Sequence, residues 1–160
     1  MSVDGCMACD VLRGKLKAPG GTIYEDSYWV VDHSVSPILL PGFLIVKLKR
    51  HCENLSELTG DEMAALAVTL KLTCTALEKV LRPARTYVCS FGESVKHVHF
   101  YVIPRLPGIP SNGLDVLRGM FESHEWAASD EKAAIVAGQV RSEIQLLTAK
   151  TSDGASGPLT

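Results

Sequence analysis

No run of apolar residues in this 160-residue chain is long enough to cross a bilayer, which argues against a membrane-spanning helix. The N-terminal segment also lacks the hydrophobic stretch of a signal peptide. We therefore expect a cytoplasmic protein that has no membrane partner.

An excess of basic residues is also missing, because 16 Lys and Arg stand against 18 Asp and Glu, for a formal net charge of -2 at pH 7. Such a chain has no general positive field, so we expect no nucleic-acid partner, and any anionic ligand must be held by a local site. We find no internal repeat and no sign of a second domain. Residues 1–147 are predicted to form one domain, followed by a small, polar and flexible tail at 148–160.

The five cysteines are an odd number, which argues against a disulfide framework in a chain without a signal peptide. Cys74 and Cys89 fall in a helical and a strand pattern, where a thiol is usually a small core residue. Cys6 and Cys9 form a C-x-x-C pair, which can be a redox pair, a metal-binding turn or a turn without metal. No βαβ pattern follows this pair, so the redox interpretation is the weakest of the three.

Two histidines could complete a metal site with the C-x-x-C pair. Zinc takes about four nitrogen or sulfur ligands, and His51 and His97 are available for the two that are missing. Residues 97–103 alternate polar or aromatic with apolar side chains, which predicts a strand with His97 and His99 on one face. Regular pairing is expected to end at Pro104. The spacing alone leaves a functional and a structural role for the two imidazoles equally open.

The remaining hydrophobic patterns predict a mixture of strands and helices. Thr59 and Glu62 form a capping box for a helix from Gly60 to Leu81, which Pro83 ends. One apolar stripe of this helix is expected to face the core: Met63, Leu66, Leu70, Cys74, Leu77 and Leu81. Strands are expected at 22–25, 28–32, 42–49, 85–91 and 95–103. Short helices are expected at 10–17 and 114–122. A last helix, begun by Ser129 or Asp130, reaches about Leu147, with Ala133, Val136, Val140, Ile144 and Leu147 inward.

The segment His97-Val98-His99-Phe100-Tyr101-Val102-Ile103 resembles the histidine-triad (HIT) motif, in which three histidines alternate with apolar residues. Its flanks, Gly92-Glu93-Ser94-Val95-Lys96 and Pro104-Arg105, agree with that motif. Pro41-Gly42-Phe43-Leu44-Ile45-Val46, which leads to Arg50-His51, resembles the second hallmark of the family. Cys6 and Cys9 resemble the N-terminus of its zinc-bearing members. The likeness covers roughly residues 6–105.

The resemblance implies an α+β fold. In the family, a five-stranded antiparallel sheet carries one long helix and a C-terminal helix, and two copies join into a ten-stranded sheet. The strands and helices predicted above agree with this arrangement. We therefore expect a homodimer.

The resemblance also implies a mechanism. HIT proteins act at the α-phosphate of nucleotides, and the middle histidine, here His99, forms a nucleotidyl-imidazole that water then hydrolyses. A hydrogen bond from its other ring nitrogen to a backbone carbonyl should fix the tautomer. Ser94 and backbone N–H groups near Gly92 are expected to hold the phosphate oxygens. Asp32 or His33 is expected to hold the ribose of a purine (AMP-type) nucleotide.

The chain departs from the family pattern at several positions. Tyr101 stands in place of the third histidine, and a tyrosine can donate a hydrogen bond to phosphate but is not a cation at neutral pH. Glu93 is an expected nucleotide-binding residue and occupies a position where many members have glutamine. Its carboxylate would repel a phosphate unless it is protonated, paired or directed at water or the leaving group. Phe43 replaces a frequent histidine, and Lys47-Leu48-Lys49 lacks the usual proline. We expect the nucleophilic step to survive with an altered rate or leaving-group preference.

In zinc-bearing members the first histidine of the triad binds the metal. The resemblance therefore implies one structural zinc ion, held by Cys6, Cys9, His51 and His97. All four positions of the tetrahedron would be taken, which leaves none for a catalytic water.

Three functions follow in decreasing order of support. The first is a hydrolase or transferase that cleaves a nucleoside phosphoramidate or a dinucleoside polyphosphate through a covalent nucleotidyl-His99 intermediate, with Ser94 and Tyr101 assisting. The second, suggested by Tyr101 and Glu93, is a purine-nucleotide-binding or regulatory protein with little turnover. The third is a zinc-stabilised interaction module whose histidines are structural.

Overall fold

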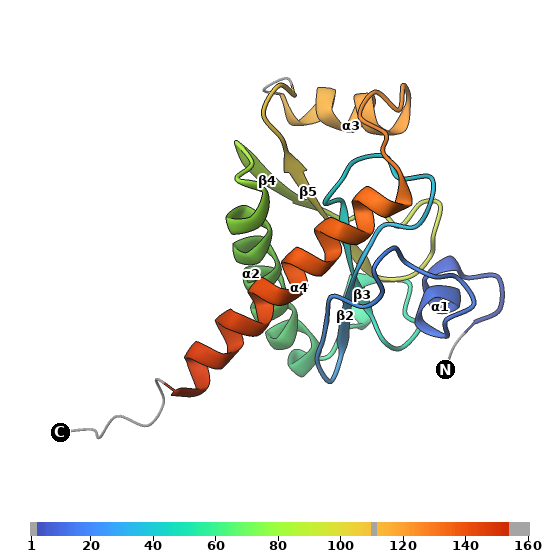
Figure 1. The fold of residues 1–160 in the computed structure, drawn as a ribbon. Coiled ribbons are helices and arrows are strands. Elements are labelled where there is room, and N and C mark those ends of the chain that lie inside the picture. The colour runs from blue at the N-terminus through green and yellow to red at the C-terminus, as the bar shows by residue number, and fades with distance from the viewer. Residues whose placement is uncertain (1–2, 110–111, 154–160) are drawn as a thin grey trace.

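The computed structural model describes residues 3–109 and 112–153, and its centre is a five-stranded antiparallel sheet in the order β1-β2-β3-β5-β4 (Figure 1). Val31 lies opposite Val46, and Val46 lies opposite Phe100, so the three central strands are in register. The predicted α+β class is confirmed. The strands are β1 Tyr24–Glu25, β2 Trp29–His33, β3 Leu44–Leu48, β4 Arg85–Cys89 and β5 His99–Arg105.

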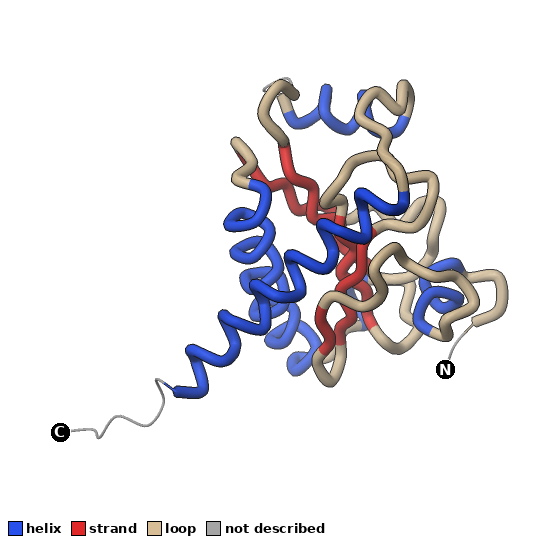
Figure 2. The backbone as a smooth tube through the Cα atoms, viewed as in Figure 1, coloured by secondary structure: helices blue, strands red, loops and turns tan. Residues whose placement is uncertain are grey.

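Two long helices, α2 (Gly60–Leu81) and α4 (Asp130–Asp153), lie side by side over one face of the sheet (Figures 1 and 2). The side chains that fill this layer are buried and almost all apolar: Trp29, Val31, Val46, Val102, Leu77 and Val140 are examples. Burying an apolar side chain of this size contributes about 1.5–3 kcal/mol. The principal core therefore lies on this face, and the opposite face of the sheet is left for a site.

Helix α2 begins and ends at the predicted residues. The Thr59 hydroxyl accepts a hydrogen bond from the Glu62 amide, and the Glu62 carboxylate accepts one from the Thr59 amide. The predicted apolar stripe is wrong at Met63, which is 49% exposed, whereas Thr69 and Thr73 are buried. Both hydroxyls find acceptors inside the layer, because Thr69 donates to the Asp26 carboxylate and Thr73 to the Thr69 carbonyl. Satisfied threonines can therefore occupy core positions.

Shorter elements cover part of the opposite face. Helix α1 (Met7–Leu12) lies at one end of this face and α3 (Gly113–Phe121) at the other, with loops between them (Figures 1 and 2). A 3-10 helix at Leu55–Glu57 leads into α2. A second apolar cluster lies under α3 and includes Leu40, Phe43, Ile103, Val116 and Met120.

The strand predicted at 95–103 is displaced, because β5 begins at His99 and continues to Arg105. The His97 amide donates to the Val95 carbonyl in a tight turn, and the Val98 amide donates to the Cys52 carbonyl. These bonds hold residues 95–98 outside the regular ladder. Pro104 does not end the strand. The pairing of β5 with β3 stops at Val102, so Pro104 has a neighbouring strand on one side only, where it lies opposite Thr86 of β4.

Several other boundaries also differ from those predicted. The first helix is Met7–Leu12 rather than 10–17, and the strands predicted from 22, 42 and 85 are each shorter. Helix α4 continues past Leu147 to Asp153. Of its five predicted inward residues, Ala133, Val136, Val140 and Ile144 are buried, and Leu147 packs partly buried against the core. The rest of the predicted tail, 154–160, lies outside the described residues. In the described ranges, no helix combines the length and apolarity needed to cross a membrane.

Candidate functional site

His99 lies at the start of β5 on the face opposite α2 and α4, because Phe100 packs into the helical layer and neighbouring residues of a strand point to opposite faces. The residue is only 4% exposed. Its Nδ1 lies 2.6 Å from the His97 carbonyl oxygen. Since a carbonyl can only accept, Nδ1 carries the proton and Nε2 keeps its lone pair. The predicted hydrogen bond to a backbone carbonyl is confirmed.

The surroundings of His99 favour the neutral imidazole. Burial lowers the pKa of His99, the hydrogen bond to the His97 carbonyl raises it in part, and the positive charge of Lys47 lowers it again. The net direction is downward, so the ring is neutral at pH 7. A neutral imidazole with a free Nε2 is the nucleophilic form.

A cavity of about 320 Å³ opens at His99, and we call it the His99 cavity. This volume lies at the lower end of the range of small-molecule sites, roughly 300–1,000 Å³. Most of the wall is apolar and includes Val35, Leu39 and Ile45, while Ser94 and Tyr101 are among the residues that contribute hydroxyl groups. Such a cavity suits a flat apolar body that carries a polar or anionic group at one end.

Tyr101 belongs to this cavity and is held by aromatic neighbours. Its ring centroid lies 5.0 Å from that of His99, 5.1 Å from that of Phe43 and 6.1 Å from that of Phe121. Burial, and then the charge of Cys89, raise the pKa of Tyr101, so the phenol stays protonated at neutral pH. Its hydroxyl makes no hydrogen bond within the described part of the chain and can therefore donate one to a ligand.

The loop before β5 sends its side chains to two different places. Gly92 has φ +70°, a left-handed conformation that glycine adopts without strain, and it turns the chain. Beyond this turn, Ser94 lines both the His99 cavity and a second cavity beside α3, whereas Glu93 lines the second cavity and the surface near Cys6 and His51 but not the His99 cavity. Gly92 does not line the His99 cavity either, so Ser94 is the only one of these three predicted residues that does.

The structure adds a cation that the sequence analysis missed. Lys47 lines the His99 cavity, and its Cα is paired with that of His99 across β3 and β5, so the two side chains share a face. The Lys47 ammonium donates to Oδ2 of Asp32, and both side chains are 4% exposed. Oδ1 of Asp32 has no hydrogen-bond partner among the described residues. A lysine inside an otherwise apolar strand was the signal that could have identified this pair.

Asp32 and His33, the two predicted ribose ligands, occupy different surroundings. Asp32 lines a neighbouring cavity of about 280 Å³ beside α1 and is paired with Lys47. His33 lines the His99 cavity, but its Nδ1 donates to the Ser34 carbonyl at 3.0 Å and its Nε2 accepts from the Gly42 amide at 2.9 Å. His33 therefore has no free ring nitrogen to offer a ribose hydroxyl, and it ties the two ends of the loop between β2 and β3 to each other.

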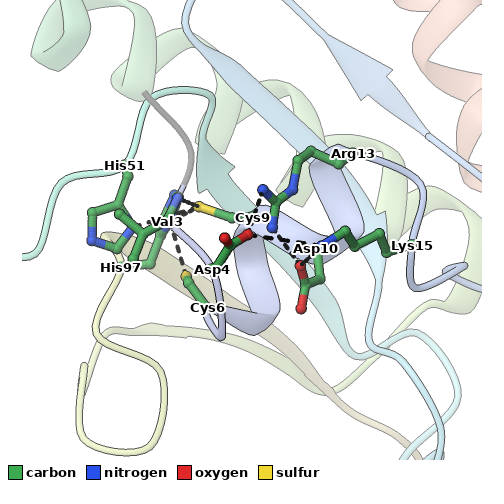
Figure 3. A network of polar contacts seen from close by, with 9 residues as sticks. All are labelled: Val3, Asp4, Cys6, Cys9, Asp10, Arg13, Lys15, His51 and His97. Carbon is green, nitrogen blue, oxygen red and sulfur yellow. Dashed lines mark hydrogen bonds and ion pairs between the residues drawn. The ribbon is translucent and has the colours of Figure 1, made fainter.

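The four predicted metal ligands meet beside α1 (Figure 3). Cys6 precedes α1 and Cys9 lies within it, while His51 follows β3 and His97 precedes β5. One ligand atom from each residue lies within 4.8 Å of the other three. Nδ1 of His97 is 3.6 Å from each cysteine sulfur, and Nδ1 of His51 is 3.5 Å from that of Cys9.

These distances fit one tetrahedral zinc ion. Bonds of about 2.3 Å to sulfur and about 2.0 Å to nitrogen put two such ligands of a tetrahedron roughly 3.5 Å apart. Nε2 of His97 donates to the Leu48 carbonyl at 2.8 Å, which leaves the lone pair of Nδ1 toward the sulfurs. Nε2 of His51 lies 3.5 Å from the Glu53 carboxylate. Partners of this kind orient ligand imidazoles in metal sites.

Further contacts hold the segment that carries the two cysteines. The Val3 amide donates to the Cys9 sulfur at 3.5 Å, and Arg13 forms ion pairs with Asp10 at 2.6 Å and Asp4 at 3.1 Å (Figure 3). Asp4 is largely exposed, so such pairs add little stability. A bound metal would therefore tie α1 to the sheet more strongly than these ion pairs do, in addition to the burial of Ala8.

Comparison with known proteins identifies the family to which this arrangement corresponds. The HIT domain family model matches residues 15–108. An uncharacterised HIT-like protein of Methanocaldococcus jannaschii is 29% identical over 107 residues, which cover 64% of this chain and 81% of that protein.

Solved structures share the fold. A zinc-bound histidine triad family protein from Mycobacterium smegmatis superposes with a TM-score of 0.67 at 17% identity, covering 91% of this chain and 97% of that one. The Plasmodium falciparum diadenosine triphosphate hydrolase, solved in complex with cyclomarin A, gives 0.59 at 16% identity, covering 78% and 76%.

Proposed function

This chain belongs to the HIT family, and from that premise we propose that it is a nucleotidyl hydrolase or transferase acting at the α-phosphate of a nucleoside phosphoramidate or a dinucleoside polyphosphate. The observation that carries the proposal is the state of His99. Its Nδ1 is bonded to a carbonyl, its Nε2 has no hydrogen-bond partner among the described residues, and it lines a cavity with Ser94 and Tyr101. The diadenosine triphosphate hydrolase of the same fold supports a reaction of this class.

The proposed reaction has two steps. Nε2 of His99 forms a bond to the α-phosphorus while the bond from phosphorus to the leaving group breaks, and the leaving atom takes up a proton from solvent. Water then attacks the phosphorus, the bond from phosphorus to Nε2 breaks, and a nucleoside monophosphate is released. The hydrogen bond from Nδ1 to the His97 carbonyl stabilises the positive charge that the ring gains on attack.

Charge on the phosphate oxygens needs donors and at least one cation. The hydroxyls of Ser94 and Tyr101 are the proposed donors, because both residues line the His99 cavity. Lys47 is the proposed cation, because it lies beside His99 in the sheet. This assignment explains how a chain with tyrosine in place of the third histidine can still stabilise a phosphoryl group.

The nucleoside is proposed to occupy the apolar part of the His99 cavity, with the base between Val35, Leu39 and Ile45. Asp32 lines the neighbouring cavity, which adjoins the His99 cavity at Val11, and it is the proposed ribose ligand where the two cavities meet. A purine is the proposed base because the family resemblance implies an AMP-type nucleotide.

The proposed zinc ion is structural. Cys6, Cys9, His51 and His97 would hold it, and all four of its positions would be filled by protein atoms. When bound, the ion supplies a cross-link between α1, the segment after β3 and the segment before β5. Nucleophilic attack is assigned to His99 of the cavity, with its ring held by the His97 carbonyl, and the leaving atom takes its proton from solvent.

A homodimer is proposed from the open edge of the sheet. Strand β4 is at one end of the strand order, and among the described strands it pairs only with β5. Pairing of two such edges would give a ten-stranded sheet and would cover the half-exposed Val88. Light scattering on the zinc-loaded protein should give twice the mass of the chain.

The decisive experiment is the mass of the intact protein after brief acid quench with adenosine phosphoramidate or diadenosine tetraphosphate, measured alongside AMP release. We expect an adduct of one nucleotidyl group, absent in His99→Ala at unchanged zinc content. His124→Asn is a matched control, because His124 is exposed and its φ of 53° suits asparagine.

Each alternative has its own outcome in this experiment. Bound nucleotide without adduct or AMP release would replace the hydrolase by a nucleotide-binding or regulatory protein, which Tyr101 and Glu93 motivate. Absence of nucleotide binding in folded, zinc-loaded protein would leave an interaction module. Full activity of His99→Ala would refute the mechanism.

A further inference from the structure

The Tyr101 side chain lacks a polar anchor, because its hydroxyl makes no hydrogen bond within the described residues. Strand pairing fixes its backbone, since its Cα lies opposite that of Ile45 in β3 and that of Cys89 in β4. Staggered rotamers still leave several directions open to the ring. The side chains that pack against the ring must therefore decide where its hydroxyl lies.

Phe43 and Phe121 form a three-ring cluster with Tyr101. Their centroids lie 5.1 and 6.1 Å from that of Tyr101 and 6.0 Å from each other. Aromatic rings whose centroids are roughly 4.5–7 Å apart attract each other. The Phe43 ring is nearly perpendicular to both partners, at 82° to Tyr101 and 88° to Phe121. The two phenylalanines therefore restrict the rotation of the phenol ring.

The two phenylalanines are held in place in different ways. Phe43 is 3% exposed and belongs to the apolar cluster under α3. Phe121 is the last residue of α3 and is 42% exposed. Burial therefore accounts for Phe43, whereas the ring contacts of Phe121 are with Phe43 and Tyr101. The helix that carries Phe121 is itself fixed, because Val116 and Met120 beneath it are completely buried.

Tyr101 and Phe43 are also two positions at which this chain departs from the HIT pattern, and the fold brings them into contact. An imidazole has two ring nitrogens and can be oriented by hydrogen bonds, as the His97 carbonyl orients His99. A phenol has one polar atom at its tip, so a tyrosine that gives its hydroxyl to a ligand must be oriented by apolar contacts. Phe43 and Phe121 supply such contacts.

We propose that Phe121 is a positioning residue, which holds the Tyr101 phenol where its hydroxyl donates to a phosphate bound at His99. The proposal rests on the proposed function and makes α3 a part of the active site. Tyr101 borders the second cavity beside α3, which measures about 390 Å³. Without the Phe121 ring, the phenol is free to turn into that cavity, and its hydroxyl leaves the phosphate.

The kinetic test is a double-mutant cycle on AMP release from adenosine phosphoramidate by zinc-loaded protein. Phe121→Ala should lower kcat/KM roughly tenfold, because small misplacements of a catalytic group cost up to about 100-fold. In Tyr101→Phe protein, the same substitution should change kcat/KM by less than about twofold, because no hydroxyl remains to be misplaced. Equal losses in both backgrounds would show that Phe121 acts independently of that hydroxyl and would overturn the proposal.

Two further variants separate positioning from damage to the helix. Phe121→Leu keeps an apolar side chain against the phenol and should recover most of the lost activity. Leu114→Ala is the matched control, because Leu114 is 64% exposed on the same helix, and it should keep the wild-type kcat/KM. A Phe121→Leu protein as slow as Phe121→Ala, or an equal loss in Leu114→Ala, would contradict the positioning role.

A second measurement does not depend on turnover. With 3-fluorotyrosine in place of the four tyrosines, the ¹⁹F resonance of Tyr101 is the one that Tyr101→Phe removes. This resonance should move toward that of the free amino acid in Phe121→Ala protein, because water reaches the ring, and it should stay in place in Leu114→Ala. AMP release with an unmoved resonance would refute only the role of Phe121. A moved resonance without AMP release from wild-type protein would refute the hydrolase and, with it, a positioning role in catalysis.

Discussion

Replacing Lys47 with methionine should lower the free energy of unfolding by about 3–5 kcal/mol, the usual cost of removing one partner of a buried ion pair. Lys47 and Asp32 are each 4% exposed at the side chain, so solvent cannot take the place of the ammonium. Oδ2 of Asp32 would lose its donor, and Oδ1 already has none among the described residues. At about 2–4 °C per kcal/mol for a chain of this size, the melting temperature should fall by roughly 6–20 °C.

The assay is urea unfolding of zinc-saturated protein at fixed chain concentration. The double variant Asp32→Asn, Lys47→Met should recover much of the loss, because neither charge remains. Lys49→Met is the matched control, since Lys49 pairs with Glu25 at 3.0 Å where the side chains are 38% and 61% exposed, and its cost should stay below about 1 kcal/mol. A Lys47→Met protein as stable as wild type, or a double variant no more stable than the single one, would refute the reasoning.

Three further predictions concern other groups. Tyr101→Phe should lower kcat/KM for AMP release by roughly 10–100-fold, because a hydrogen bond to a charged phosphate is lost; an unchanged value would remove Tyr101 from the mechanism. Cys9→Ser should lose bound zinc by atomic absorption and melt at lower temperature, whereas Cys74→Ser should keep the metal; equal metal content would refute the site. The hydrogen bond from Arg50 lowers the pKa of Glu62 from 4.5 to about 2. The ionised carboxylate therefore stabilises the fold fully above pH 4.5, and this contribution to the free energy of unfolding is lost as the pH falls toward 2. Glu62→Gln should flatten the unfolding free energy in that window, and a variant with the wild-type slope would contradict this assignment.

Some features could be predicted from the sequence because short-range interactions determine them. Thr59 and Glu62 satisfy each other's amides three residues apart, so the start of α2 is visible in the sequence. The backbone partner of His99 is likewise only two residues away. The full set of metal ligands was predicted from the resemblance to zinc-bearing HIT proteins. Spacing alone does not join His51 and His97, because they come from separate segments that only the fold brings together.

Other features depended on packing that spacing does not encode. Thr69 and Thr73 are buried in place of Met63 because their hydroxyls find acceptors, one of them on Asp26 before β2. The start of β5 at His99 depends on the bond from Val98 to Cys52, which removes residues 95–98 from the ladder. Asp26 and Cys52 are distant in sequence from Thr69 and Val98, so the hydrophobic pattern alone predicted both features wrongly.

The sequence by itself determined the α+β class, the ends of α2 and the candidate residues Cys6, Cys9, His51, His97 and His99. Only the tertiary structure decided what surrounds these residues. It paired Lys47 with Asp32 beside His99, turned Glu93 away from the His99 cavity and brought α3 up to Ser94 and Tyr101. The physical reason is that caps, turns and strand alternation depend on neighbouring residues, whereas burial, charge pairing and cavity shape depend on segments joined only by folding.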